Sequence, residues 1–190
     1  MSRSITGAIA ALAVGAVLVA GCSSGGGKST STSAAGGSGS SSASGPSEVS
    51  FNGVTLSGAS DLANKPTVQS KSHTAPTALQ VKDVVTGDGP AASPTASVTV
   101  QYVGVKYADG KQFDASWDHG GATSFSLQQV VPGFTQGIGG NGTVAPMKVG
   151  GRRIMILPAS LGYGAQGTPD GTIGPNTPLV FVVDLVGVNG

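Results

Sequence analysis

Alternating apolar and polar residues in the C-terminal half are the feature that most constrains how this chain can fold. Val98, Val100 and Tyr102 alternate with Thr99 and Gln101, which is the period-two pattern of a β-strand. Three further segments have strand character, namely 79–85, 153–157 and 179–185. Together these segments predict an antiparallel sheet with one buried face.

One segment carries the signals of a helix. Pro132 is favoured at the first helical position because proline lacks the N–H that would be unpaired there, and Gly139 with Gly140 ends the segment. We expect this helix of barely two turns to pack on the concave face of the sheet. The predicted fold class is therefore α+β, with a twisted antiparallel β-sheet wrapped around one short α-helix.

The N-terminus has the layout of an export signal. Arg3 precedes the apolar run 5–20, and small residues close the run before Cys22. The run is shorter than the roughly 20 apolar residues that a transmembrane helix needs. We therefore predict a signal peptide over 1–21.

Cys22 is the single cysteine of the chain, so no intramolecular disulfide can form. Its position directly after Leu-Val-Ala-Gly resembles a bacterial lipobox, which implies lipidation of the thiol and a mature chain that begins at Cys22. Two acyl chains give stable anchoring, so this motif predicts a lipid anchor at the extracytoplasmic face of the cell membrane. The alternative is cleavage nearby with an unused cysteine.

The segment 22–47 consists almost wholly of Ser, Gly, Thr and Ala, which predicts a disordered tether because little apolar surface is available for burial. Residues 48–76 show no helical period and predict an extended N-terminal arm that adds an edge strand. The folded domain is expected over 77–190.

Composition argues against several classes of function. Charged residues make up 10% of the chain and no basic cluster is interleaved with aromatic residues, so no nucleic-acid partner is expected. The two histidines, His73 and His119, have no cysteine or carboxylate at metal-ligand spacing, so no metal site and no acid–base pair are predicted. Residues 137–142 match G-x-G-x-x-G but follow the predicted helix instead of a strand, which argues against a dinucleotide site.

Six short motifs follow one another in order between Tyr102 and Val183. They are Tyr102-Val103-Gly104, Asp109-Gly110-Lys111, Phe113-Asp114, Val130-Val131-Pro132-Gly133-Phe134, Leu161-Gly162-Tyr163-Gly164 and Leu179-Val180-Phe181. This series resembles the FKBP-type peptidyl-prolyl cis-trans isomerases. The resemblance implies an FKBP-like fold with an apolar pocket between helix and sheet, and no cofactor.

The resemblance also implies a set of site residues. The catalytic set is Tyr102, Asp114, Phe134, Tyr163 and Phe181. The substrate-binding set is Phe113, Val130, Val131 and Ile173. Within these sets, Tyr163 is expected to donate a hydrogen bond to a substrate carbonyl, and Asp114 to lie where the amide dipole changes. Such a site needs no nucleophile, because isomerisation breaks no covalent bond and requires only that a twisted amide is bound better than a planar one.

Two residues and one segment depart from the family pattern. Phe134 stands where the best-known members carry tryptophan, Thr123 stands where an aromatic wall residue is usual, and residues 139–146 lengthen the connection after the helix. Phenylalanine keeps an apolar floor but lacks the indole N–H, and loss of the aromatic wall predicts a wider or wetter pocket.

These observations predict a monomeric peptidyl-prolyl cis-trans isomerase that assists the folding of exported proteins at the membrane surface. Its expected partners are X–Pro segments of secreted or surface proteins, with macrolides as further ligands of the pocket. One alternative is a non-catalytic module of the same fold that binds proline segments or acts as a chaperone. Another is a structural surface lipoprotein whose pocket is filled by its own side chains.

Overall fold

The computed structural model describes residues 46–71, 74 and 76–189. The predicted signal peptide, the lipidation site Cys22 and nearly all of the tether lie outside the described residues, as does His73. Within this described part, no helix is long and apolar enough to cross a membrane. Its elements are β1 (Glu48–Phe51), β2 (Val54–Ser57), β3 (Thr67–Ser70), β4 (Gln80–Val85), β5 (Ser97–Lys106), β6 (Gln112–Ala115), η1 (Ser116–His119), β7 (Thr123–Ser126), α1 (Pro132–Gly139), β8 (Arg152–Leu157), η2 (Ala159–Leu161) and β9 (Leu179–Asn189).

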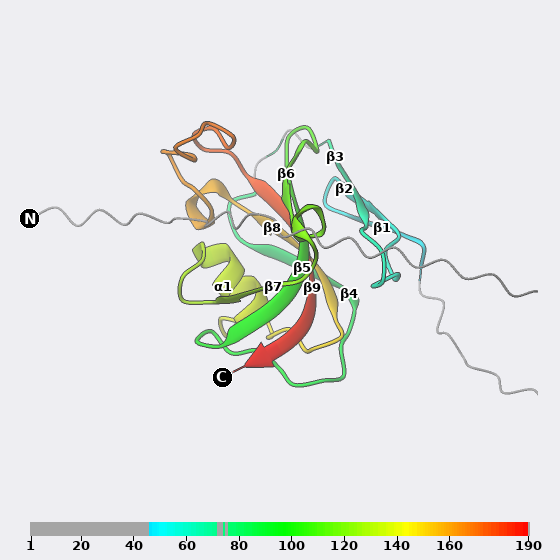
Figure 1. Cartoon of the computed structure of the whole chain (residues 1–190). Coiled ribbons are helices and arrows are strands. Elements are labelled where there is room, and N and C mark those ends of the chain that lie inside the picture. The colour runs from blue at the N-terminus through cyan, green and yellow to red at the C-terminus, as the bar shows by residue number, and fades with distance from the viewer. Residues whose placement is uncertain (1–45, 72–73, 75, 190) are drawn as a thin grey trace, which may run out of the picture. The chain divides into compact units, whose positions relative to one another are not determined.

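A six-stranded antiparallel sheet forms the centre of the fold (Figure 1). Its order is β4-β8-β9-β5-β6, and β7 pairs with β5. The ten-residue strand β5 pairs with β9 along its whole length, while its other edge pairs first with β7 and then with β6. The predicted antiparallel sheet with one short helix is thereby confirmed.

The helix α1 lies close to β8 because two of its glycines remove side chains from the contact. A Cβ atom on Gly133 would come within 2.3 Å of Leu157, and one on Gly137 would come within 2.3 Å of the Met155 sulfur. Pro132 begins the helix and Gly140, with a φ of 83°, follows its end, as the sequence predicts. The spacing of the glycines thus sets the depth at which the helix sits on the sheet.

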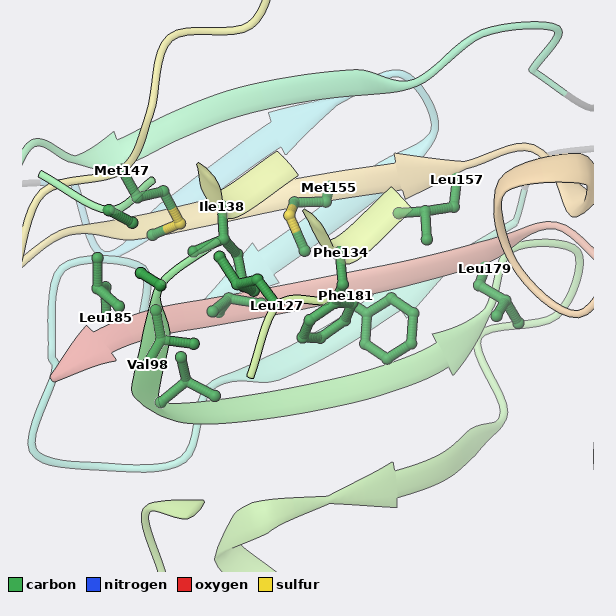
Figure 2. Packing of buried hydrophobic residues seen from close by; sticks show 14 of the residues in the cluster. Val98, Leu127, Phe134, Ile138, Met147, Met155, Leu157, Leu179, Phe181 and Leu185 are labelled. Atoms are coloured by element: carbon green, nitrogen blue, oxygen red, sulfur yellow. The ribbon is translucent and has the colours of Figure 1, made fainter. Parts of the chain in front are cut away.

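Apolar side chains fill the space between α1 and the sheet (Figure 2). Phe134 and Ile138 enter this core from the helix, and Met155 and Phe181 enter it from β8 and β9. All four side chains are at most 5% exposed. This core is the hydrophobic layer on which the candidate site is built.

The segment before the domain folds into a sheet of its own. Strands β1, β2 and β3 form a three-stranded antiparallel sheet, where an extended arm with an added edge strand was expected. Asn52 and Gly53, with φ values of 45° and 80°, connect β1 to β2, and positive φ at both central residues is the requirement of a type I′ hairpin turn. We call this three-stranded sheet the arm sheet.

The arm sheet buries the second face of the central sheet, so the expectation of one buried face is wrong. Val54 and Leu56 are fully buried in a second cluster, whose central-sheet members are Val103, Val105, Ala115, Ile154, Ile156, Val180 and Val182. The reason is visible in β8 and β9, where apolar residues occupy consecutive positions and not every second one. Such runs are typical of strands that are buried on both faces.

Two consecutive arginines of β8 connect the central sheet to the layers on its two faces. Arg152, which is fully buried, donates to both oxygens of Asp184 at 2.5 and 2.6 Å and to the Gly58 carbonyl oxygen at 2.7 Å. Its neighbour Arg153 donates to both oxygens of Asp83 at 2.6 and 2.9 Å. Buried ion pairs are tolerated when further hydrogen bonds satisfy the charged groups, and here the guanidinium of Arg152 also holds the arm sheet.

Arg153 connects β8 to the helix α1 and to the loop that follows the helix. One of its terminal nitrogens donates to the Gly137 carbonyl oxygen in α1 and to the Ala145 carbonyl oxygen in the following loop, both at 2.7 Å. Within that loop, the side chain of Asn141 accepts hydrogen bonds from the amides of Thr143 and Val144. The connection after the helix is therefore fastened to β8 by a buried cation.

Candidate active site

Four aromatic rings predicted for the site meet between α1 and the central sheet. Phe134 of α1 packs edge-to-face on Phe181 of β9, with ring centroids 4.6 Å apart and an interplanar angle of 89°. Tyr102 of β5 lies 6.3 Å from Phe134 and 6.4 Å from Phe181. Phe113 of β6 packs on Phe181 at 5.5 Å. We call Tyr102, Phe113, Phe134 and Phe181 the ring cluster.

Gly104 allows the ring cluster to close. A Cβ atom at this position would lie 2.6 Å from the Phe113 ring and 2.9 Å from the Phe181 ring. A side chain on Gly104 would therefore separate the rings of β6 and β9 that pack across β5.

Phe125 is a further aromatic residue beside the ring cluster, and it was not among the predicted site residues. Phe125 belongs to β7 and follows Thr123 by two residues. Its ring centroid lies 5.9 Å from that of Phe134. Residues two apart on a strand point to the same face, so Phe125 supplies an aromatic contact on the side where Thr123 has none. The alternation Thr-Ser-Phe-Ser is the signal from which this strand and its inward aromatic residue could be identified.

Asp114 is the carboxylate of the site, and two partners hold it. The Tyr102 hydroxyl donates to its Oδ2 at 2.5 Å, and the His119 Nε2 lies 3.0 Å from its Oδ1. Burial raises the pKa of Tyr102 well above its usual range, and the hydrogen bond to Asp114 and the charge of this carboxylate raise it further. Tyr102 therefore remains a hydrogen-bond donor to Asp114 at all ordinary pH values.

His119 has a carboxylate partner, Asp114, although the sequence predicted none for either histidine. Strand β6 ends at Ala115, and the 3-10 turn η1 that follows brings residue 119 back beside residue 114. The prediction was wrong for His119 because the contact depends on the geometry of this turn, which the spacing of five residues does not reveal.

Tyr163 lies half-buried beside the core, just after η2. Burial raises the pKa of its hydroxyl, and the charges of Asp114 and Asp170 raise it further. Among the residues that the structure describes, this hydroxyl has no hydrogen-bond partner, in contrast to that of Tyr102. It is a protonated donor available to a ligand.

The remaining predicted residues also lie against the core. Ile173 is 3% exposed and belongs to it, while Val130 and Val131 are partly buried and pack on it at the start of α1. Two hydrogen bonds fix Ile173, since its amide donates to the Thr168 hydroxyl at 2.9 Å and its carbonyl oxygen accepts from the Thr168 amide at 2.8 Å. The structure thus brings the whole predicted set to one side of the central sheet. In residues 46–71, 74 and 76–189, no group of three or more His, Cys, Asp or Glu could hold a metal ion.

A sheet wrapped around one short helix, with aromatic rings between the two, defines an α+β protein with an aromatic site. The family model of FKBP-type peptidyl-prolyl cis-trans isomerases matches residues 89–186. An FK506-binding protein of Streptomyces anulatus is 45% identical over 126 residues, which cover 65% of this chain and 97% of that protein. A probable FK506-binding protein of Corynebacterium glutamicum is 38% identical over 122 residues, covering 64% of this chain and 97% of that protein.

Solved structures agree with the sequence relatives. The crystal structure of AtFKBP13 superposes with a TM-score of 0.56 at 33% identity, covering 61% of this chain and 97% of that one. The crystal structure of FkpA from Escherichia coli gives a TM-score of 0.52 at 36% identity, covering 63% of this chain and 53% of that one. The chain belongs to the FKBP-type peptidyl-prolyl cis-trans isomerase family. The predicted fold and the predicted enzyme class are confirmed.

Proposed function

We propose that this isomerase accelerates the folding of exported proteins while a lipid on Cys22 holds it at the extracytoplasmic face of the cell membrane. The sequence of the first 22 residues supports this localisation, because a charged start, an apolar run and a single cysteine after Leu-Val-Ala-Gly are arranged as in a bacterial lipoprotein. Its clients are X–Pro bonds, which otherwise equilibrate over tens to hundreds of seconds. The enzyme acts as a monomer with no cofactor.

The ring cluster and its two polar neighbours carry the proposed reaction. Rotation about an X–Pro bond has a barrier of about 18–20 kcal/mol because amide resonance is lost. A twisted amide is less polar than a planar one, so it loses less solvation on entering a site walled by Tyr102, Phe134 and Phe181. The single observation that carries the proposal is this set of packed rings beside the free Tyr163 hydroxyl.

Tyr163 and Asp114 act on the amide in this proposal. Tyr163 donates a hydrogen bond to the substrate carbonyl, and Asp114, held by Tyr102, faces the amide dipole as it changes during rotation. Phe113, Val130, Val131 and Ile173 bind the proline-containing segment by apolar contact. Macrolides are a second class of ligand for the same pocket, an idea that the name of the Streptomyces relative supports.

The test of the proposed site is an isomerase assay on the full chain with Tyr163→Phe and Asp114→Asn. We expect each substitution to lower kcat/KM while unfolding free energy stays within about 1–2 kcal/mol of wild type, because the changed groups are polar tips outside the core. The substitution Phe181→Ala serves as a contrast, since this ring is 4% exposed and its loss costs about 3–5 kcal/mol. Equal losses of stability in all three variants would contradict the assignment of Tyr163 and Asp114 to the site.

The test of the anchor is the substitution Cys22→Ser. A hydroxyl lacks the nucleophilicity of the thiol, so the variant is expected to lose fatty-acid labelling and to leave the detergent phase. If a fatty-acid analogue labels wild type and variant equally, the lipid is attached elsewhere and the proposed anchor fails, whatever the isomerase activity.

A further inference from the structure

The carboxylate of Asp114 is held at each of its two oxygens by a different element. Tyr102 of β5 donates to Oδ2 at 2.5 Å, and His119 of η1 places Nε2 3.0 Å from Oδ1. The side chain of Asp114 is 29% exposed, whereas that of His119 is 70% exposed. Oδ2 therefore has a partly buried donor, Tyr102, and Oδ1 has a neighbour, His119, that is largely in contact with solvent.

The other charged groups near His119 are occupied by partners of their own. Asp118, its neighbour in η1, accepts hydrogen bonds from Lys65 Nζ at 2.7 Å and from Gln112 Nε2 at 2.8 Å. These two bonds, that of Lys65 first, hold the pKa of Asp118 below its usual range, so Asp118 remains ionised near neutral pH. Tyr102 and Tyr163 remain protonated, since burial raises the pKa of both. Histidine, by contrast, is the residue type that changes charge between pH 5 and 8.

We propose that His119 is a positioning residue of the isomerase, which fixes the carboxylate of Asp114 most firmly when its imidazole is protonated. The proposal rests on the catalytic role proposed for Asp114. A hydrogen bond between two charged groups is shorter and stronger than one with a neutral donor. The imidazolium form fixes both oxygens, whereas the neutral form leaves Tyr102 as the one strong donor. The proposal therefore predicts higher activity when the imidazole of His119 is charged than when it is neutral.

The experiment compares pH profiles of kcat/KM for the full chain and its variants. Exchange between cis and trans forms of a capped X–Pro peptide without ionisable groups is followed by NMR, which avoids a coupling protease with its own pH dependence. We expect wild-type kcat/KM to fall by about two- to five-fold from pH 5 to 8, the scale of an ion pair whose histidine is largely exposed. His119→Gln should be flat at the lower level, and His119→Arg should be flat at the higher level, because arginine keeps its charge.

Two further variants make the result decisive. His73→Gln removes the only other histidine of the chain and should retain the pH step, so a step that disappears with His73 overturns the proposal. In Asp114→Asn, exchange of His119 for Gln should have no further effect, because its partner has lost its charge. If Asp114→Asn is fully active, the proposed site is wrong; if it is impaired while His119→Gln keeps the pH step, the role of His119 alone is refuted.

Discussion

Phe134 packs against three other aromatic rings at the site, as many as Phe181 does. Its centroid lies 4.6 Å from that of Phe181, 5.9 Å from that of Phe125 and 6.3 Å from that of Tyr102. A side chain so enclosed can grow only if a neighbour moves. Phe125, on the edge strand β7 and only partly buried, is the neighbour with the most freedom to do so.

The substitution Phe134→Trp tests whether residue 134 forms part of the proposed binding site. We expect tighter binding of a proline peptide by about 0.5–1.5 kcal/mol, since a larger aromatic face is added. Unfolding free energy should fall by about 1–3 kcal/mol, because the core on either side is already filled. Fluorescence titration measures the binding, with wild type as the control, since its single tryptophan, Trp117, packs on the opposite face of the central sheet. A new tryptophan signal that ignores saturating peptide would show that residue 134 does not contact the ligand.

The raised pKa of Tyr102 predicts a loss of stability at alkaline pH. The unfolded chain titrates this hydroxyl near pH 10, whereas the folded protein keeps it protonated to higher pH. The contribution is therefore fully present below about pH 10 and is lost as pH rises beyond that value. Denaturant unfolding at pH 8 and pH 11 should show a smaller decrease for Tyr102→Phe than for wild type. A decrease of equal size in the variant would mean that the pKa of Tyr102 is not raised in the folded protein.

At the scale of residues, the sequence predicted which side chains meet but not all of their partners. The order of the motifs was enough to predict that Tyr102, Phe134 and Phe181 meet, because the two strands and the helix that carry them could be identified from the sequence. His119 and Phe125 were missed. Each lies on an element of only four residues, the 3-10 turn η1 or the strand β7, and the position of each element depends on its tertiary contacts with β5.

Among the elements, the arm sheet changes the physical picture of the domain most. Leu56 of β2 is fully buried between the arm sheet and the central sheet, in the same cluster as Ile154 and Val182. The Tyr107 hydroxyl donates to the Asn52 carbonyl oxygen at 2.8 Å, and the Ser70 hydroxyl donates to the Tyr107 carbonyl oxygen at 2.5 Å. The arm sheet is thus bound to the domain by apolar burial and by directed hydrogen bonds.

Replacing Leu56 by Ala measures how much this contact stabilises the domain. We expect unfolding free energy to fall by about 2–5 kcal/mol, because a fully buried leucine leaves a cavity. The matched control is Val186→Ala on β9, a position 50% exposed, where the change should stay within about 0.5 kcal/mol. Equal small effects at both positions would show that the arm sheet does not pack on the domain in solution.

The sequence predicted long elements better than short ones. The helix was identified from Pro132 at its start and Gly139 with Gly140 at its end, and strands β4, β5, β8 and β9, which have six or more residues each in the structure, were identified from their apolar patterns. Strands of four residues, such as β1, β2 and β3, give too short a pattern, although Asn52-Gly53 is a strong hairpin signal. The consecutive apolar residues of β8 and β9 also indicated that the second face of the sheet is buried by another part of the protein.

For the molecule as a whole, the folded unit begins before the predicted domain boundary at residue 77. Limited digestion of the full chain with a non-specific protease should leave a resistant core that starts near Pro46, because the arm sheet is hydrogen-bonded and buried. Native mass spectrometry should find the arm sheet still bound if the protease also cuts between β3 and β4. A stable core that begins near residue 77 and has lost the arm sheet would contradict this boundary.

The two arginines at the start of β8 have a consequence for how the central sheet pairs. The next four residues of β8 are apolar and buried on both faces, so a slip of one position would exchange one set of apolar side chains for another at little cost. Arg152 and Arg153 do not permit the exchange, because each lies directly opposite its own aspartate, Asp184 on β9 and Asp83 on β4. A slipped strand would separate both guanidinium groups from their carboxylates inside the protein. Two adjacent charges thereby give this strand the unique alignment that its hydrophobic pattern cannot provide.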